Sequence, residues 1–179
     1  THATLEVSAA DAAIMARGGQ GDPGYGDRFH YEPVQADKLL KDGDKVELGG
    51  VSLTAHLTPG HTPGCTTWTM KVEEGGRPYD VLFLCSVTAP GYQLVGNPRY
   101  PDIAADFTRS FAILRALPCD VFLGAHGGYY DLQGKYARLE HREPGNPFID
   151  PKGYRAYLDK AEQAFEQELA EQQASAAKH

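Results

Sequence analysis

Long hydrophobic runs and an excess of positive charge are both missing from the 179-residue sequence. No apolar stretch approaches the ~20 residues that span a membrane, so we predict no transmembrane helix. The 17 Lys and Arg residues are outnumbered by 24 Asp and Glu, and the net charge of -7 argues against nucleic acid, whose phosphates would repel the chain. The first residues, THATLEVSAAD, show no basic segment followed by an apolar one, which predicts no signal peptide. A cytosolic protein, a processed exported protein and a chain that begins further upstream all fit this start.

Cysteine is scarce as well. The chain holds three, which form no CxxC pair: Cys65, Cys85 and Cys119. Isolated cysteines are often small buried apolar side chains, whereas a disulfide among them would indicate an oxidising compartment. Charged residues make up 23% and hydrophobic residues 41%, an ordinary globular balance. With no internal repeat and no low-complexity tract, we predict a single domain over residues 1–179.

Strand-like and helix-like hydrophobic patterns occur in turn along the chain, which predicts an α/β sandwich. The segment VELGGVSLTAHL is typical of a β-hairpin around Gly49 and Gly50. The second arm of this hairpin places His56 on the solvent side and four apolar residues on the other: Val51, Leu53, Ala55 and Leu57. Further strands are predicted at residues 4–7, 65–72, 79–85 and 119–125. Trp68, on the second of these, is predicted to lie in the core.

Three helices are predicted from their caps and apolar spacing. Ser8 suits the N-cap of a helix over residues 9–17, with Asp11 in a capping-box-like relation to it. A second helix ends at Pro118 and has apolar residues at helical spacing: Ile103, Phe107, Phe111 and Leu114. A third begins at Asp150-Pro151, runs to about residue 172 and buries Tyr154, Leu158, Ala161, Phe165 and Leu169.

Two histidines follow strands in equivalent places, His61 in LTPGHTPG and His126 in LGAHGG. Rigid scaffolds place chemistry on such loops, and the flanking glycines let the backbone approach a ligand closely. Neutral imidazole is the commonest metal ligand, so zinc is the predicted metal. A catalytic zinc site ordinarily has three protein ligands, however, and two histidines do not complete one. The other histidines with no motif, His30, His141 and His179, are predicted to lie on the surface.

Four segments make the prediction more specific: GHTPGCTTW, CSVTAPGYQLVGNPRYPDI, LPCDVFLGAH and NPFIDPKGYRAYL. Together they resemble the metallo-beta-lactamases of the third subclass, whose second zinc site is rich in histidine. The resemblance extends from SAADAAIMARGG to the last predicted helix. GHTPG alone is shared with a wider metallo-hydrolase superfamily that includes glyoxalase II-like thioesterases. The serine-bearing segment CSVTAPGYQLVGNP narrows the resemblance to the lactamases.

The resemblance implies an αββα sandwich with two zinc ions that share a bridging water. His61 would bind the first zinc and His126 the second. Two cations lower the pKa of that water so that hydroxide exists near neutral pH, and one polarises the lactam carbonyl. Hydroxide then opens the strained amide without a covalent acyl-enzyme. The implied substrates are penicillins, cephalosporins and carbapenems, hydrolysed in the periplasm, and the implied outcome is antibiotic resistance.

The resemblance also assigns roles after the strand at residues 79–85. Ser86 would face the metals and contact the substrate carboxylate, assisted by Thr88. Neighbouring strand residues face opposite ways, so Cys85 would point away and pair with Cys65 in a disulfide. The rival is Cys85 as a thiolate zinc ligand, since Asp or Cys can serve at this strand end in the superfamily. Tyr92 would donate a hydrogen bond to the developing oxyanion, or its ring would pack under the loop.

The sequence departs from the family pattern because the HxHxDH motif, which supplies the remaining zinc ligands, is absent. His2 does not substitute, because the other histidines and the aspartate are missing around it. We therefore expect mainly the C-terminal half of the sandwich, with an exposed sheet face that a companion N-terminal segment or a second chain covers. Two alternatives to a lactamase remain: a catalytically inactive fragment or swapped half, and a relative that hydrolyses thioesters or lactones. Ser86 disfavours the second, because such enzymes use a bridging aspartate there.

Overall fold

The computed structural model describes residues 3–178, and its main sheet starts with the predicted hairpin. Gly49 and Gly50 both take positive φ in the turn, which side chains with a Cβ avoid. The five strands pair in chain order: β3 (Lys45–Leu48), β4 (Val51–Leu57), β5 (Thr66–Glu74), β6 (Arg77–Leu84) and β7 (Val121–Gly124). All pairs are antiparallel except β6 with β7. The C-terminal ends of β4, β6 and β7 therefore lie at the same edge of the sheet.

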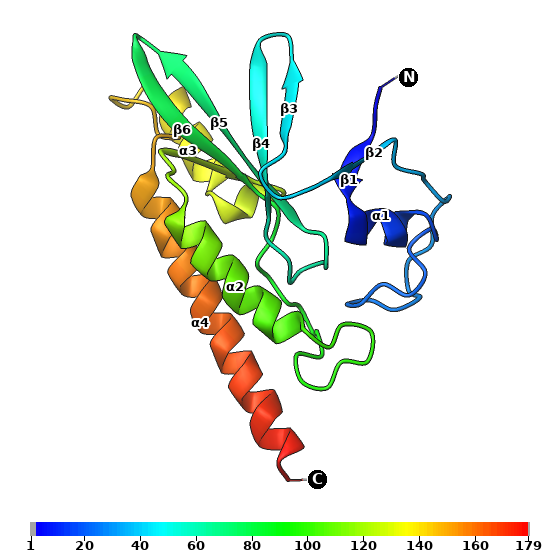
Figure 1. Ribbon diagram of the computed structural model, residues 1–179. Coiled ribbons are helices and arrows are strands. Elements are labelled where there is room, and N and C mark those ends of the chain that lie inside the picture. The colour runs from blue at the N-terminus through cyan, green and yellow to red at the C-terminus, as the bar shows by residue number, and fades with distance from the viewer. Residues whose placement is uncertain (1–2, 179) are drawn as a thin grey trace.

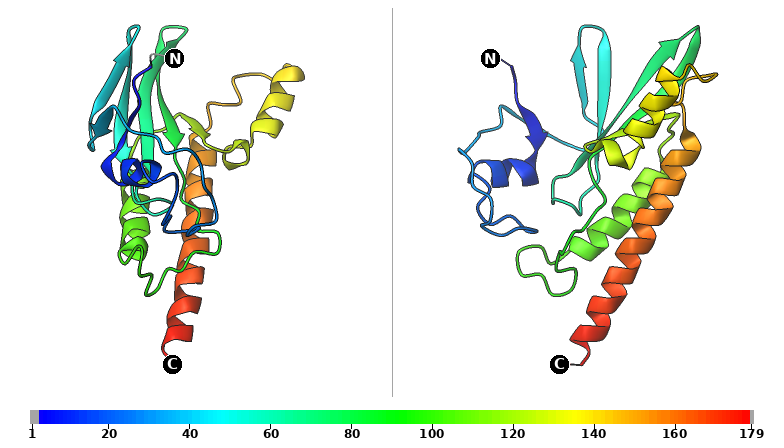
Figure 2. Two further views of the ribbon diagram at one scale, coloured as in Figure 1. Left: turned by 90° about the vertical axis from the view of Figure 1, so that its right-hand side faces the viewer. Right: turned by 180° about the vertical axis from the view of Figure 1, so that it is seen from behind.

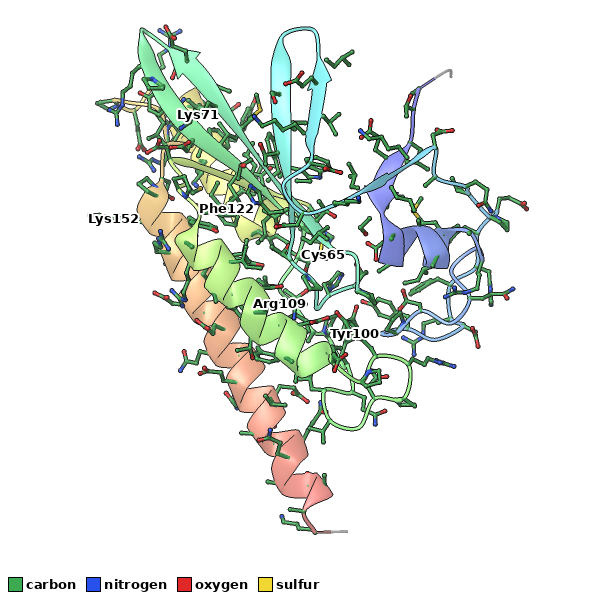
Figure 3. The ribbon with its side chains drawn as sticks, in the orientation of Figure 1. Cys65, Lys71, Tyr100, Arg109, Phe122 and Lys152 are labelled. Atoms are coloured by element: carbon green, nitrogen blue, oxygen red, sulfur yellow. A yellow bond between two sulfur atoms is a disulfide. The ribbon has the colours of Figure 1, made fainter. Side chains whose placement is uncertain are left out.

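Two long helices cover one face of β6 and β7. Helices α2 (Ile103–Ala116) and α4 (Pro151–Ala176) lie side by side, and α4 continues well past α2 (Figure 1). The predicted apolar residues of both helices form the core with the inward side chains of the sheet; the fully buried members include Leu82, Phe107, Phe111, Leu114, Phe122, Tyr154 and Leu158. Phe122 is labelled at this contact in Figure 3. The sequence patterns thus located both helices and their buried faces correctly.

The N-terminal part forms a separate small layer on the far side of the main sheet from these helices. Strand β1 (Glu6–Ser8) pairs in parallel with β2 (Lys38–Leu40), and α1 (Ala9–Met15) follows β1 directly. The right-hand view of Figure 2 shows this layer beside the β4–β5 connection, far from the end of α4. Strand β2 was not predicted, and neither were the short helix η1 (Gly127–Tyr129) and helix α3 (Leu132–Glu140). These elements are short or weakly apolar, so the sequence pattern gives little signal for them, and contacts with neighbouring elements stabilise them.

The second face of the main sheet carries an apolar groove that no helix of the described residues covers. Alternation in β5, β6 and β7 brings its lining side chains to one side: Met70, Val72, Tyr79, Val81, Phe83 and Leu123. Trp68 belongs to this face and is half-buried, where the sequence had predicted a core position. The half-sandwich expected from the sequence stays a prediction, and an exposed sheet face is what it would leave.

His56 corrects another prediction. It lies on the opposite side of β4 from Ala55, as expected, but it is half-buried rather than open to solvent. Its Nε2 lies 2.7 Å from Thr69 Oγ1 on β5, and burial lowers the pKa of its imidazole. His30 and His141 are exposed as predicted, whereas His2 and His179 lie outside the described residues.

Among the described residues, no helix combines the length and the hydropathy that crossing a membrane requires.

Candidate metal and substrate site

The common edge of β4, β6 and β7 gathers the predicted site residues. His61 lies on the β4–β5 connection, Ser86 and Thr88 follow β6, and His126 follows β7. Leu84 at the end of β6 pairs with Gly124 at the end of β7, so the segments that follow them leave the sheet side by side. Cys65, which closes the His61 connection, is labelled at this edge in Figure 3.

The corner that carries His61 is fixed by close backbone packing. Gly60 has a φ of 140°, and a Cβ at this position would lie 2.7 Å from the ring of Phe107 on α2. Only glycine satisfies both conditions. From the same helix, the buried Ser110 hydroxyl donates a hydrogen bond of 2.6 Å to the carbonyl of Pro59. The corner is therefore held against α2 on one side.

Helix α1 holds the corner on the other side. The Asp11 carboxylate accepts hydrogen bonds from Thr62 Oγ1 at 2.8 Å and from the amide of Gly64 at 2.9 Å. Ser8 Oγ donates to the Gly64 carbonyl at 2.7 Å. Burial raises the pKa of the Asp11 carboxyl group, against the opposite effect of these two hydrogen bonds. Ser8 is the predicted N-cap, but Asp11 binds the corner instead of returning to the backbone of Ser8.

The orientation of the His61 ring follows from one contact. Its Nδ1 lies 2.8 Å from the backbone carbonyl of Thr88, and since a carbonyl can only accept, Nδ1 carries the proton. The other ring nitrogen, Nε2, is then the one with a free lone pair. Metal-binding histidines are usually held in this way, with the second ring nitrogen donating to a carbonyl or carboxylate.

A chain of contacts continues from Thr88 to His126. Ser86 Oγ lies 3.1 Å from Thr88 Oγ1 and 3.1 Å from the hydroxyl of Tyr129. The Tyr129 ring meets the exposed His126 ring edge to face, with 5.2 Å between centroids. The two histidines are therefore linked through the predicted substrate-binding residues and one tyrosine.

Of the two roles predicted for Tyr92, its position fits the one in which the ring packs under a loop. Its side chain is 3% exposed, and its ring stacks on His61 at 5.8 Å between centroids. Gly24 and Tyr25 of the loop before β2 cover it from outside, and the Tyr25 ring meets it at 5.6 Å. Burial raises the pKa of the Tyr92 phenol. The contacts support a role in packing under the loop, and the oxyanion role stays a prediction.

The structure pairs Cys65 and Cys85 in a disulfide between the start of β5 and the end of β6, with 5.9 Å between their Cα atoms. Ser86 lies on the other side of the chain, toward Thr88 and Tyr129. Cys119 is free and partly buried, and burial raises the pKa of its thiol to about 12. The rival role of Cys85 as a zinc ligand does not fit this pairing.

Removal of the disulfide is expected to cost about 3 kcal/mol of unfolding free energy, because it closes a loop of 20 residues. Urea unfolding of the Cys65→Ala/Cys85→Ala variant measures this loss, with Cys119→Ala as the matched control. Alkylation of the denatured parent without reductant should label Cys119 alone. Labelling of Cys85 under those conditions would refute the pairing.

The donor set for zinc is suitable in kind but incomplete in number. His61 offers an oriented Nε2, and His126 offers an exposed imidazole at the same edge. Within residues 3–178, however, no three His, Cys, Asp or Glu side chains come together where they could hold a metal ion. Two histidines are fewer than the three protein ligands that a catalytic zinc site ordinarily has.

Two contacts of the candidate site could not be predicted from the sequence. Tyr129 carries no motif, and its contact with Ser86 depends on the parallel pairing of β6 with β7. Asp11 was assigned to its own helix, although the carboxylate reaches a turn more than 50 residues away. For the Tyr129 contact, the one local signal was that Tyr129 follows His126 closely in the sequence.

Comparison with known proteins identifies the family, although no family model matches the chain. The FEZ-1 metallo-beta-lactamase of Legionella gormanii is 43% identical, with a TM-score of 0.92 over 97% of this chain and 67% of that one. BJP-1 of Bradyrhizobium japonicum, a subclass B3 metallo-beta-lactamase, is 37% identical, with a TM-score of 0.88 over 98% of this chain and 66% of that one. The metallo-beta-lactamase of Cronobacter sakazakii is 40% identical, with a TM-score of 0.87 over 96% and 65%.

Matches among curated proteins are short. A probable metallo-hydrolase of Burkholderia pseudomallei is 47% identical over 45 residues, 25% of this chain and 15% of that protein. The persulfide dioxygenase ETHE1 of Bos taurus is 44% identical over 38 residues, 21% of this chain and 15% of that protein. The chain spans about two thirds of the solved structures that it matches. Because these structures match nearly the whole of this chain, it belongs to the metallo-beta-lactamases of the third subclass, B3, as its motifs predicted.

Proposed function

We propose that this chain provides part of a zinc-dependent beta-lactamase, which hydrolyses the lactam amide of penicillins, cephalosporins and carbapenems. The observation that carries the proposal is the common edge where His61, Ser86 and His126 meet, in a chain 43% identical to a metallo-beta-lactamase. Bound zinc would supply Lewis-acid polarisation of the lactam carbonyl and activation of the attacking water. Periplasmic location is part of the proposal, and the Cys65–Cys85 disulfide supports an oxidising compartment.

The residues of this chain would bind and orient. His61 and His126 would each contribute one imidazole to one of two zinc ions. The hydroxyls of Ser86 and Thr88 would hold the substrate carboxylate near them, because hydroxyl groups donate well to an anionic oxygen. Fixing the carboxylate positions the lactam carbonyl for attack, which is how binding energy lowers a reaction barrier.

The remaining ligands are proposed to come from polypeptide that also covers the open sheet face. Two facts support a companion segment or a second chain in this role. The apolar groove over β5, β6 and β7 is flanked by Phe148 and Ile149, and the described residues leave most of its lining side chains partly exposed. The same residues hold no set of three metal-binding side chains. One added layer would satisfy both needs, since buried apolar surface and zinc ligands would arrive together.

Zinc content and turnover test the proposal together. Two zinc ions per complete site and chelator-sensitive hydrolysis of a chromogenic cephalosporin are expected, with activity restored by zinc after chelation. The protein is purified with and without a separately supplied polypeptide that carries HxHxDH. Substoichiometric zinc and no turnover in both preparations would instead favour a catalytically inactive fragment. Hydrolysis of thioesters or lactones but not of the cephalosporin would favour the other superfamily activity.

A further inference from the structure

The three hydroxyl groups of Thr88, Ser86 and Tyr129 form a connected chain with Ser86 in the middle. Ser86 Oγ has both hydroxyl partners at 3.1 Å, and it also accepts from the amide of Thr88 at 3.3 Å. Ser86 is 4% exposed, so these partners, rather than bulk water, satisfy it. No part of the proposed function uses Tyr129.

The proton and lone pairs of the Ser86 hydroxyl limit the directions that the hydrogen bonds among the three hydroxyl groups can take. A serine hydroxyl has one proton and two lone pairs, and the Thr88 amide takes one lone pair. Of the two remaining partners, one must donate to Ser86 and the other must accept from it. A phenol is a stronger acid than an aliphatic alcohol, which favours donation by Tyr129 to Ser86 and by Ser86 to Thr88.

Tyr129 is held firmly enough to impose this direction. Its ring packs on Tyr157 with 5.1 Å between centroids, and its amide donates to the His126 carbonyl at 3.0 Å. Gly124 lies under the ring, where a Cβ would be 2.9 Å from Tyr129 Cδ2. The position of the hydroxyl is thus fixed by β7 and α4 rather than by the flexible side chain alone.

We propose that Tyr129 is a positioning residue that makes Ser86 and Thr88 hydrogen-bond donors toward a carboxylate. With both serine lone pairs occupied, the Ser86 proton can go only outward, to Thr88 or to an incoming anion. Thr88, in turn, presents its own proton. The connected hydroxyl groups then favour an anionic acceptor over a neutral ester, because a carboxylate oxygen is the stronger acceptor. This inference rests on the proposed function for the identity of the carboxylate, which is that of the lactam substrate.

The Tyr129→Phe variant tests the proposal, because it keeps the ring contacts and removes only the hydroxyl. With the HxHxDH polypeptide supplied and a cephalosporin that carries a free carboxylate, KM is expected to rise about fivefold, with kcat nearly unchanged. For the methyl ester of the same cephalosporin, both constants should stay at the parental values. Tyr130→Phe is the matched control, since Tyr130 packs on Phe122 and its hydroxyl makes no hydrogen bond within residues 3–178. Equal effects on acid and ester, or a fall in kcat alone, would overturn the positioning role.

A binding measurement separates failure of this inference from failure of the proposed function. Phenylacetate, a carboxylate without a lactam, is titrated into zinc-free protein while the amide resonances of Ser86 and Thr88 are followed. The parent should show saturable shifts, and Tyr129→Phe should bind several-fold more weakly. If these shifts occur but no lactam is hydrolysed, the hydroxyl chain stands and the lactamase proposal fails. If no shift occurs in an active enzyme, the hydroxyl chain is refuted and the lactamase proposal stands.

Discussion

Replacing His61 with alanine is expected to lower lactam hydrolysis by about a thousandfold or more and to remove one zinc ion per site. Loss of one zinc ion removes several kcal/mol of charge stabilisation, and each 1.4 kcal/mol or so is a factor of about ten in rate. The ring also gives up its hydrogen bond to the Thr88 carbonyl, so the loop that follows β6 loses a contact. Metal analysis of the dialysed protein and turnover of a chromogenic cephalosporin measure the two effects.

A matched histidine gives the control. His141 is exposed and follows α3, well outside the edge formed by β4, β6 and β7. The His141→Ala variant should keep parental zinc content and rate, and thermal unfolding should show that both variants fold. Unchanged zinc binding and hydrolysis in His61→Ala would contradict the assignment of His61 as a ligand.

Replacing Asp11 with alanine is expected to lower the free energy of unfolding by about 2–3 kcal/mol. The carboxylate accepts from Thr62 and Gly64, and its loss leaves two partly buried donors without partners. Because this turn carries His61, zinc affinity should fall as well. Urea unfolding and competition with a zinc chelator measure the two quantities. Glu6→Ala on β1 serves as the control for loss of a carboxylate, because it breaks only an exposed ion pair with Lys38.

The Asp11→Asn variant separates hydrogen bonding from charge. An amide can accept from the Gly64 amide and donate to the Thr62 hydroxyl, so both contacts survive. Burial raises the pKa of the Asp11 carboxyl group in the folded protein, and its contribution to stability is therefore present at low pH and lost as pH rises through that pKa. We expect Asp11→Asn to match the parent at acid pH and to be more stable than it at neutral pH. A variant as unstable as Asp11→Ala at every pH would contradict this.

The fold was predictable where a local pattern also matched the tertiary contacts. The pair Gly49-Gly50 closed a hairpin, and the spacing of Phe107 and Phe111 marked the buried face of α2. Strand β2 could not be predicted, because Lys38–Leu40 is a strand only through pairing with β1, which lies 32 residues earlier in the chain. Trp68 was misplaced for a related reason: an apolar residue predicts burial, and only the arrangement of layers reveals that one face is open.

The site was predictable as separate residues but not as an arrangement. The glycine-flanked positions of His61 and His126 at strand ends indicated chemistry, and the resemblance assigned Ser86 and Thr88. What joined them was invisible in the sequence: a backbone carbonyl at Thr88 and a phenol at Tyr129. Contacts of this kind depend on which strands are neighbours, and no short motif encodes the neighbour of a strand.

The junction after β6 also limits how this protein can evolve. Cys85 turns one way to reach Cys65, and Ser86 turns the other way to reach Tyr129. A single codon gained or lost just before this pair would exchange the two directions, sending a thiol toward Tyr129 and a hydroxyl toward the unpaired sulfur of Cys65. Residues can therefore be substituted here one at a time, but a change in the length of the segment would forfeit the crosslink and the contact with Tyr129 in the same step.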